Sequence, residues 1–262
     1  MIAVIGAGAM GEVFVSGLLR TGIEPGRLVI SEKRDERARE VSQRYGVRSV
    51  TVAEAAREAA TVLLLVKPQD VSGVLDEMRP LLADGAVVIS LAAGIRLRVL
   101  EAALPGAAVV RAMPNTPALV DLGITAISPG ASCTPAQADY VESLLSAVGP
   151  VVRVPEDLQD AVTATSGSGP AYLFLLIESM IAGSVDLGVP AEVARQLVTQ
   201  TVLGAATMAA RPGAEAGALR EQVTSPGGTT AAALATFSEG DFAGLVARAM
   251  AAARDRGREL GA

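Results

Sequence analysis

The sequence has no histidine and no tryptophan among its 262 residues, and its only cysteine is Cys133. Without histidine, the chain lacks the commonest general acid or base near neutral pH and the commonest metal ligand, so any catalysis must proceed without imidazole. A single cysteine excludes an internal disulfide and a cysteine-based metal site, as is typical of proteins of the reducing cytoplasm. We therefore expect a cytoplasmic protein without a metal site.

Aromatic residues, basic runs and long hydrophobic runs are also scarce. Only 3% of the residues are aromatic although 50% are hydrophobic, so Ala, Val, Leu and Ile must build the core. The net charge of −6 argues against nucleic acid as a partner, because phosphates require a basic face. The most apolar later stretch, 171–177, ends at Glu178 and is too short to span a bilayer, and residues 1–11 lack the basic start of a signal peptide. These features predict a soluble protein that binds neither nucleic acid nor membrane.

Residues 1–155 alternate between short apolar runs and amphipathic stretches. The predicted strands cover residues 2–5, 28–31, 47–50, 62–66, 86–90, 108–111, 124–128 and 151–154, and the predicted helices cover residues 12–19, 34–45, 53–59, 71–82, 97–104 and 135–146. Such alternation is typical of a parallel sheet with helices on both faces. We expect an α/β protein whose N-terminal domain, residues 1–155, is a Rossmann-type doubly wound sheet.

Residues 156–262 change to long helical periodicity. Apolar residues recur at helical spacing in two stretches: Leu173, Leu176, Ile177, Met180 and Ile181, and then Phe242, Leu245, Val246, Ala249 and Met250. Roughly a hundred helical residues with such broad apolar stripes exceed what one short bundle buries, which indicates a partner subunit. The second domain is therefore predicted to be all-α, and the protein to be a homo-oligomer.

A glycine-rich string, Gly6-Ala7-Gly8-Ala9-Met10-Gly11, follows the first predicted strand and precedes the first predicted helix. The string alone also occurs in ordinary glycine-rich turns. In this strand-turn-helix position it predicts a dinucleotide site, in which Gly6 and Gly8 allow the turn and close approach of the pyrophosphate, and Gly11 allows helix packing.

The end of the second strand indicates which nicotinamide cofactor binds. Glu32 is suited to the ribose hydroxyls of NAD, whereas Ser31, Lys33 and Arg34 are suited to the 2′-phosphate of NADP. We favour NADP and keep NAD as the alternative. Lys33 and Arg34 are also common as solvated residues that open a helix.

Three later strands end in small residues, prolines or amides, at 66–69, 92–94 and 113–117. Ligands of open α/β sheets bind at this carboxyl edge. The amide of Asn115 is suited either to the carboxamide of nicotinamide or to orienting its loop, and Asn115 between two prolines is equally typical of a plain turn. Lys67 is likewise a candidate ligand or a surface residue.

Two segments of the helical half carry further signals. In residues 166–172, Ser168 and Pro170 are typical of a capped helix start, and the additional serine-glycine pair indicates close approach to a cofactor or a neighbouring subunit. In residues 223–230, a Pro-Gly-Gly turn closes on Thr229 and Thr230 before a helix-forming run. Unpaired N–H groups at such a helix start bind an anion such as a carboxylate.

Taken in order, these segments resemble the pyrroline-5-carboxylate reductase family. The resemblance covers essentially the whole chain and is carried by residues 6–11, 66–68, 92–94, 111–117, 166–172 and 219–237, with Ser225-Pro226-Gly227-Gly228-x-Thr230 as its most distinctive motif. It implies reduction of the C=N bond of 1-pyrroline-5-carboxylate to L-proline with NAD(P)H, the last step of proline biosynthesis. It also implies a helical domain that interlocks two subunits into a homodimer, with dimers often assembled into decamers.

The resemblance implies a set of site residues at matching positions. Cofactor contacts fall on Gly6, Ala7, Gly8, Ala9, Met10, Gly11, Leu65, Val66, Lys67, Pro68, Ala92, Ala93, Gly94, Asn115 and Gln222, beside Ser31, Lys33 and Arg34 considered above. Substrate contacts fall on Glu156, Ser225, Gly227, Gly228, Thr229 and Thr230. Thr163 and Thr230 are the candidate catalytic residues, because the hydroxyl of one or the other would hydrogen-bond the ring nitrogen.

This chemistry is consistent with the absence of histidine. A protonated cyclic imine is already electrophilic, so hydride attack requires positioning rather than a proton donor. The helix start at 225–230 would hold the substrate carboxylate, and Glu156 would favour the cationic imine.

The sequence departs from the family pattern at two places, and two other functions compete with this reading. Residues 214–217 replace a common His-Pro-Gly, and Val52 replaces an asparagine of the cofactor loop, so one loop shape and one adenosine-side contact do not follow from the resemblance. A β-hydroxyacid dehydrogenase would need a lysine that residues 171–186 lack. A non-catalytic dinucleotide sensor would have no use for the segment 225–230.

Overall fold

The computed structural model describes residues 1–260, and it divides the chain into two compact units. The first contains Met1–Ser168 together with the chain from Ala252 onward, and the second contains Gly169–Ala251. Each unit is described by itself below. Residues 156–168 thus belong to the first compact unit, and the domain boundary at residue 155 remains a prediction.

The first unit is built on an eight-stranded sheet with the strand order β3-β2-β1-β4-β5-β6-β7-β8. Its strands are β1 (Ile2–Ile5), β2 (Leu28–Ser31), β3 (Arg48–Ser49), β4 (Thr61–Leu64), β5 (Val87–Ser90), β6 (Ala108–Met113), β7 (Thr125–Pro129) and β8 (Val151–Arg153). The strand order reverses at β1, because β2 pairs with one side of it and β4 with the other. This topology confirms the Rossmann-type doubly wound sheet and places a topological switch point, where such folds bind ligands, at the end of β1.

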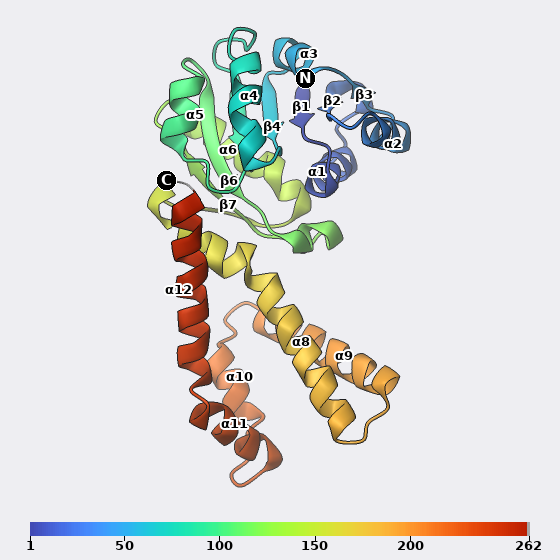
Figure 1. The fold of residues 1–262 in the computed structure, drawn as a ribbon, viewed down its shortest axis with the longest axis vertical. Helices are drawn as coiled ribbons and strands as arrows, with labels where there is room; N and C mark the ends of the chain where they lie inside the picture. Colours follow the sequence, from blue (N-terminus) through green and yellow to red (C-terminus); the bar gives the residue numbers. More distant parts are fainter. Residues whose placement is uncertain (261–262) are drawn as a thin grey trace. The chain divides into compact units, whose positions relative to one another are not determined.

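Six α-helices of the first unit cover the two faces of the sheet (Figure 1). They are α1 (Ala9–Arg20), α2 (Asp35–Tyr45), α3 (Val52–Glu58), α4 (Pro68–Met78), α5 (Leu97–Ala103) and α6 (Pro135–Leu145). One buried cluster joins α1, α2 and α6 to the sheet, with Phe14 and Leu18 fully buried. A second joins α3, α4 and α5 to the other face, with Met78 and Leu100 fully buried. Each cluster is almost entirely aliphatic, as the composition requires.

The expectation of a parallel sheet was wrong at its last two strands, because β8 pairs parallel with β7 and so shares its reversed direction. β7 runs antiparallel to β6, with Arg111 opposite Ser128. The connection between them, residues 114–124, contains only the 3₁₀ helix Thr116–Val120. A parallel crossover needs a dozen or more residues and usually an α-helix, which this connection is too short to supply.

Local sequence signals explain where several helices begin. Thr51 and Glu54 form a reciprocal capping box at the start of α3, and Thr134 and Gln137 form another at the start of α6. In each box the threonine hydroxyl accepts a bond from the backbone N–H three residues later, which satisfies an otherwise unpaired helical donor.

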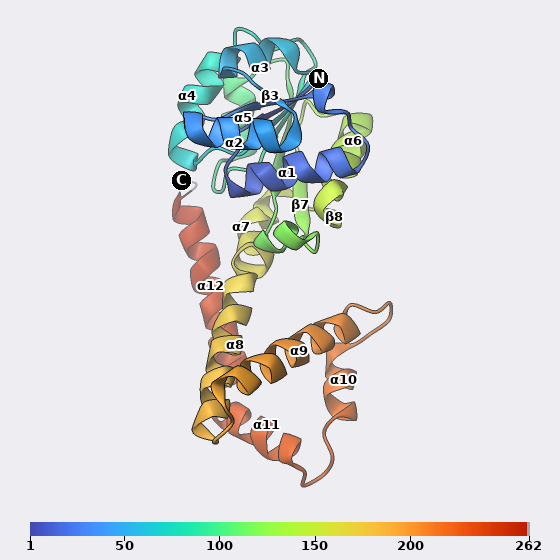
Figure 2. The ribbon, with the colours of Figure 1, turned by 90° about the vertical axis from the view of Figure 1, so that its right-hand side faces the viewer.

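The second unit is helical, as predicted. It contains α8 (Gly169–Asp186), α9 (Ala191–Ala209), α10 (Ala216–Gln222), α11 (Thr229–Glu239) and the first part of α12 (Phe242–Leu260). Figure 2 shows α8 beside α9, and these two helices pack together. Within this fully described unit only Ala194 and Val198 are buried, whereas Phe174 and Leu175 on α8 are 60% and 64% exposed. A single copy therefore does not bury the apolar faces of its own helices.

Residues 163–167 form a π-helical turn between α7 (Gln159–Val162) and α8. The expectation that Ser168 caps a new helix was wrong, because its backbone is itself right-handed helical and its N–H donates to the carbonyl of Thr163, 2.8 Å away. Pro170 cannot donate an N–H to the preceding turn, and a widened turn is one way to place proline inside a continuous helix. The resulting stretch, Glu156–Asp186, is long and apolar enough to cross a membrane by length and composition alone.

Candidate functional site

A cavity of about 1100 Å³ lies at the carboxyl edge of β1, β2 and β4. Its lining includes eight of the predicted cofactor residues: Gly6, Gly8, Ser31, Lys33, Arg34, Leu65, Val66 and Lys67. Glu32 and Val52 also line it. The cavity lies at the switch point of the sheet, the position at which open α/β sheets bind dinucleotides.

The three glycines of the loop differ in what the fold requires of them. Gly6 has φ +97°, and a Cβ there would lie 2.7 Å from the carbonyl oxygen of Leu65. A Cβ on Gly11 would lie 2.0 Å from the carbonyl oxygen of Gly6. A Cβ on Gly8 would meet no atom within 4 Å. Packing therefore requires glycine at Gly6 and Gly11, whereas Gly8 keeps open the space that a closely approaching ligand needs.

The loop ends at the start of α1, where Gly8 is the N-terminal cap and supplies no side chain to the first N–H groups. These N–H groups and the helix dipole together favour an anion at this position. The residues present thus fit the pyrophosphate of a dinucleotide, both in the space beside Gly8 and in the donors next to it.

The end of β2 pairs its acidic residue with a basic neighbour. Arg34 donates to the Glu32 carboxylate from its backbone N–H at 3.2 Å and from Nε at 2.9 Å. Burial alone would raise the pKa of Glu32, but these bonds from Arg34 hold it below its ordinary value. The Glu32 side chain is only 6% exposed, whereas that of Arg34 is 61% exposed. Lys33 binds Asp70, 2.9 Å away. The outward-facing cations at this edge are therefore the Arg34 guanidinium and the Lys33 ammonium, whose side chain is 72% exposed.

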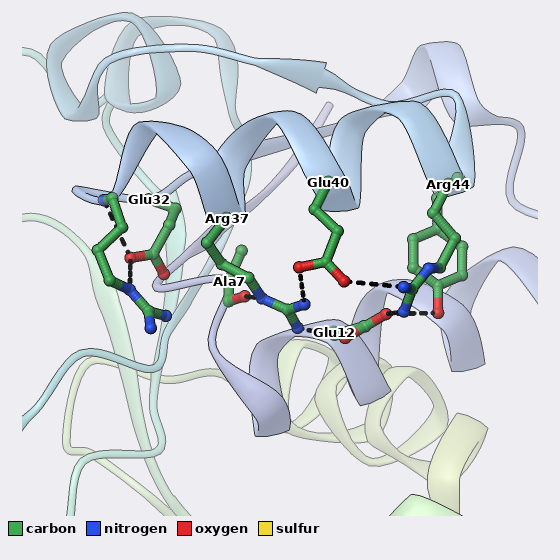
Figure 3. A network of polar contacts seen from close by, with 8 residues as sticks. Ala7, Glu12, Glu32, Arg37, Glu40 and Arg44 are labelled. Carbon is green, nitrogen blue, oxygen red and sulfur yellow. Dashed lines mark hydrogen bonds and ion pairs between the residues drawn. The ribbon is translucent and has the colours of Figure 1, made fainter.

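A polar network, seen in Figure 3, connects the glycine loop to α1 and α2. Arg37 donates from Nε to the carbonyl oxygen of Ala7 at 3.0 Å, and its other nitrogens pair with Glu12 and Glu40. Arg44 pairs with the same two carboxylates. Sequence reasoning missed this network, because the residues of α2 that bind Glu12 are 25 to 33 residues away from it in the sequence. Only the fold brings α2 against α1.

The other predicted cofactor residues lie outside the lining of this cavity. They are Ala7, Ala9, Met10, Gly11, Pro68, Ala92, Ala93, Gly94, Asn115 and Gln222. Pro68 is the first residue of α4, and Gly94 has φ +78° in the loop after β5. The side-chain oxygen of Asn115 accepts a bond from the backbone N–H of Ile124, 2.9 Å away, and so closes the loop between β6 and β7. This geometry favours the loop-orienting interpretation of Asn115.

Two predicted substrate-side residues have partners within the first unit. The Oε1 atom of Glu156 accepts from the backbone N–H of Leu97 at 2.5 Å and lies 3.3 Å from the guanidinium of the buried Arg111. Arg111 also pairs with Asp160, 3.4 Å away. The hydroxyl of Thr163, in the π-helical turn, donates to the carbonyl of Gln159. Among residues 1–260, the second carboxylate oxygen of Glu156 has no hydrogen-bond partner, and the hydroxyl oxygen of Thr163 can still accept a bond.

The segment 225–230 forms a turn that leads into α11. The N–H of Gly228 donates to the carbonyl of Ser225 at 3.0 Å, and Gly227 has φ +68°, a conformation that favours glycine. Helix α11 begins at Thr229, and its cap residue Gly228 supplies no side-chain bond. The first N–H groups of α11 are therefore available at an exposed turn, as the sequence predicts, and Gln222 ends the preceding helix α10.

Two family models match the chain. The one described as "Pyrroline-5-carboxylate reductase dimerisation" matches residues 156–260, and the one described as "NADP oxidoreductase coenzyme F420-dependent" matches residues 1–94. The chain is 43% identical to pyrroline-5-carboxylate reductase from Corynebacterium melassecola, covering 99% of this chain and 98% of that one. It is 38% identical to the enzyme of the same name from Arabidopsis thaliana, covering 99% and 95%.

Solved structures of such enzymes share the whole fold. The structure of a pyrroline-5-carboxylate reductase from Coxiella burnetii superposes with a TM-score of 0.94 at 36% identity, covering 100% of this chain and 98% of that one. The enzyme from Plasmodium falciparum, solved with NADP bound, superposes with a TM-score of 0.87 at 27% identity, covering 100% and 98%. The similarity therefore extends through both units of the chain.

Proposed function

This chain belongs to the pyrroline-5-carboxylate reductase family, whose NAD(P)H-dependent members reduce 1-pyrroline-5-carboxylate to L-proline in proline biosynthesis, and we propose which of its residues serve that reaction. The observation that supports the cofactor assignment most strongly is the open space at Gly8, beside the uncapped start of α1. Fold packing does not explain glycine at this position, whereas a bound pyrophosphate does.

The chemistry divides between the cofactor and the chain. Bound nicotinamide supplies the hydride. The chain positions the substrate. The cationic imine is already electrophilic and needs no proton donor in the hydride-transfer step, so the absence of histidine does not prevent the reaction. The residues proposed at the reacting end are Thr163 or Thr230, one of whose hydroxyl oxygens accepts the single N–H of the protonated ring nitrogen, and Glu156, whose negative charge favours the cationic form of the substrate.

The substrate carboxylate is assigned to the segment 225–230. Its support is the helix start described above, where backbone N–H groups lie beside the hydroxyls of Thr229 and Thr230. We expect Thr230→Val to raise the KM for 1-pyrroline-5-carboxylate at least tenfold, about 1.4 kcal/mol of lost binding, with little change in the KM for the cofactor. Unchanged kinetics would refute this assignment.

NADPH is proposed as the preferred cofactor. Because Arg34 neutralises Glu32, the acidic residue that would otherwise repel a 2′-phosphate is already paired. The exposed remainder of the Arg34 guanidinium offers further donors, which suit a phosphate better than a ribose diol. Lys33 adds a second positive charge at the same edge.

The apolar faces of α8, α9 and α12 are assigned to a second copy of the chain rather than to lipid. Support comes from the dimerisation model that matches residues 156–260 and from the exposed apolar residues of a unit with almost no core of its own. A homodimer, its further assembly into a decamer and a cytoplasmic location belong to this proposal. Sedimentation velocity of the purified chain measures the assembly size.

One assay tests the proposed activity directly. Purified chain is mixed with 1-pyrroline-5-carboxylate and either NADPH or NADH, and the loss of absorbance of the reduced cofactor is followed together with the formation of L-proline. The expected result is stoichiometric L-proline with a higher kcat/KM for NADPH than for NADH. Cofactor oxidation without L-proline would contradict the assigned substrate.

A further inference from the structure

Arg37 has a role in the glycine loop that its position on α2 does not reveal. It is 30 residues away from Ala7 in the sequence, yet its Nε donates to the Ala7 carbonyl oxygen at 3.0 Å (Figure 3). Ala7 is fully buried, so this carbonyl needs a partner within the protein. Arg37 supplies it from a side chain that is itself only 17% exposed.

The guanidinium is held in one orientation by three acceptors. Nε binds the Ala7 carbonyl, and the two terminal nitrogens pair with Glu12 on α1 and Glu40 on α2. Burial alone would raise the pKa of Glu12, but hydrogen bonds from Arg37, Tyr45 and Arg44 keep it below its ordinary value. Glu12 therefore stays ionised near neutral pH and keeps its ion pair with Arg37.

The bond from Arg37 to the Ala7 carbonyl also fixes the direction of the Gly8 N–H, because both groups belong to the same planar peptide. The carbonyl of Ala7 and the N–H of Gly8 belong to one peptide unit, and no cis peptide bond occurs among the described residues. In a trans peptide the two groups point in opposite directions. Because the Ala7 carbonyl points toward Arg37, the Gly8 N–H points away from the guanidinium. Gly8 is also the residue beside which the loop leaves space for a ligand.

We propose that Arg37 is a positioning residue that orients the Gly8 N–H group toward the pyrophosphate of the nicotinamide cofactor. The inference rests on the proposed role of the loop 6–11 in binding that pyrophosphate. It differs from a simple charge effect, because the guanidinium lies between two carboxylates and its own charge is balanced.

Arg44 provides a matched control, since it pairs with the same Glu12 and Glu40 but makes no bond to the loop. We expect Arg37→Met to raise the KM for NADPH about tenfold, while kcat and the KM for 1-pyrroline-5-carboxylate stay within about twofold, the pattern of an interaction present in both ground and transition states. Arg44→Met should leave the KM for NADPH within about twofold. A thermal melt of each variant separates loss of binding from loss of folding.

Arg37→Lys keeps the charge but cannot serve three acceptors in one plane, so it should also raise the KM for NADPH. Arg37→Lys also provides the test if the Arg37→Met protein does not fold. Direct titration of NADPH fluorescence gives the corresponding dissociation constants. A wild-type KM in Arg37→Lys, or an equal rise in Arg44→Met, would show that charge rather than orientation matters and would overturn the proposal.

Gly8→Ala separates this inference from the function on which it rests. If Gly8→Ala weakens NADPH binding and Arg37→Met does not, the loop binds the cofactor without help from Arg37, and the inference alone fails. If neither substitution weakens NADPH binding, the assignment of the loop 6–11 itself fails. If both do and Arg44→Met does not, the proposal is supported.

Discussion

Replacing Gly8 and Gly11 separately with alanine should distinguish the role of the loop in binding NADPH from its role in the stability of the fold. We expect Gly11→Ala to lower the stability and Gly8→Ala to weaken NADPH binding. A Cβ at Gly11 would lie 2.0 Å from the Gly6 carbonyl oxygen, a backbone atom that cannot move without distorting the turn. Overpacking costs about 1–3 kcal/mol, and contact with a fixed backbone atom belongs at the upper end of that range. At roughly 2–4 °C per kcal/mol for a chain of this size, Gly11→Ala should lower Tm by about 6–12 °C.

Gly8→Ala should behave in the opposite way. Its backbone, at φ −64° and ψ −163°, is extended and open to any residue, and a Cβ there meets no atom within 4 Å. Restricting the unfolded chain should stabilise the protein by about 0.4–1 kcal/mol, a rise in Tm of a few degrees at most. The new methyl group occupies the proposed path of the pyrophosphate, so the KM for NADPH should rise at least about tenfold.

Thermal melts without ligand and initial rates over a range of NADPH concentrations measure both effects on the same preparations. A lower Tm in Gly8→Ala comparable to that in Gly11→Ala would show that the fold, and not a ligand, requires glycine at residue 8. A wild-type KM for NADPH in Gly8→Ala would remove the pyrophosphate from this loop.

Two further substitutions test the charges around the loop. Arg34→Ala should raise the KM for NADPH about tenfold and leave that for NADH within about twofold, as initial rates with each cofactor will show; an equal loss for both would exclude a role at the 2′-phosphate. Glu12 has a lowered pKa in the folded state, so its ionised form stabilises the protein above its unfolded pKa and this contribution is lost as the pH falls through the folded pKa. Glu12→Gln should therefore lower Tm at pH 7, and the difference in Tm from wild type should shrink as the pH falls below the unfolded pKa of the carboxyl. A difference that stays constant at all pH values would contradict this reasoning.

The strands of the first unit could be predicted from the sequence because each central strand is buried on both faces and so reads as a short apolar run. The run 28–31 is fully buried, as is 87–90, and both lie within one residue of their predicted ends. The direction of β7 could not be predicted in this way, because the apolar pattern of a strand is the same in either direction. It depends instead on the length of the connection from β6.

The parts of the candidate site that consecutive residues form could be predicted from the sequence. The parts that depend on contacts between residues distant in the sequence could not. Glycine spacing identifies the loop at 6–11, and the structure places Gly6 and Gly8 in the cavity lining. The bond from Arg37 to Ala7 joins two segments that approach only when α2 packs beside α1. The π-helical turn before Pro170 was missed for a related reason, since Ser168 and Pro170 also fit a helix start and local residue preference does not distinguish the two.

The distribution of charge explains how a chain with a net charge of −6 can bind an anionic cofactor. The cofactor edge is not made basic by an excess of lysine and arginine. Instead, the acidic side chains nearest the loop are paired: Glu32 with Arg34, and Glu12 with both Arg37 and Arg44. Each pairing removes a repulsion that would oppose the phosphates, and leaves the helix start at α1 as the local positive end. Because Arg37 is largely buried while Arg34 is exposed, salt should screen the two ends of the cofactor site unequally, with the 2′-phosphate end the more sensitive.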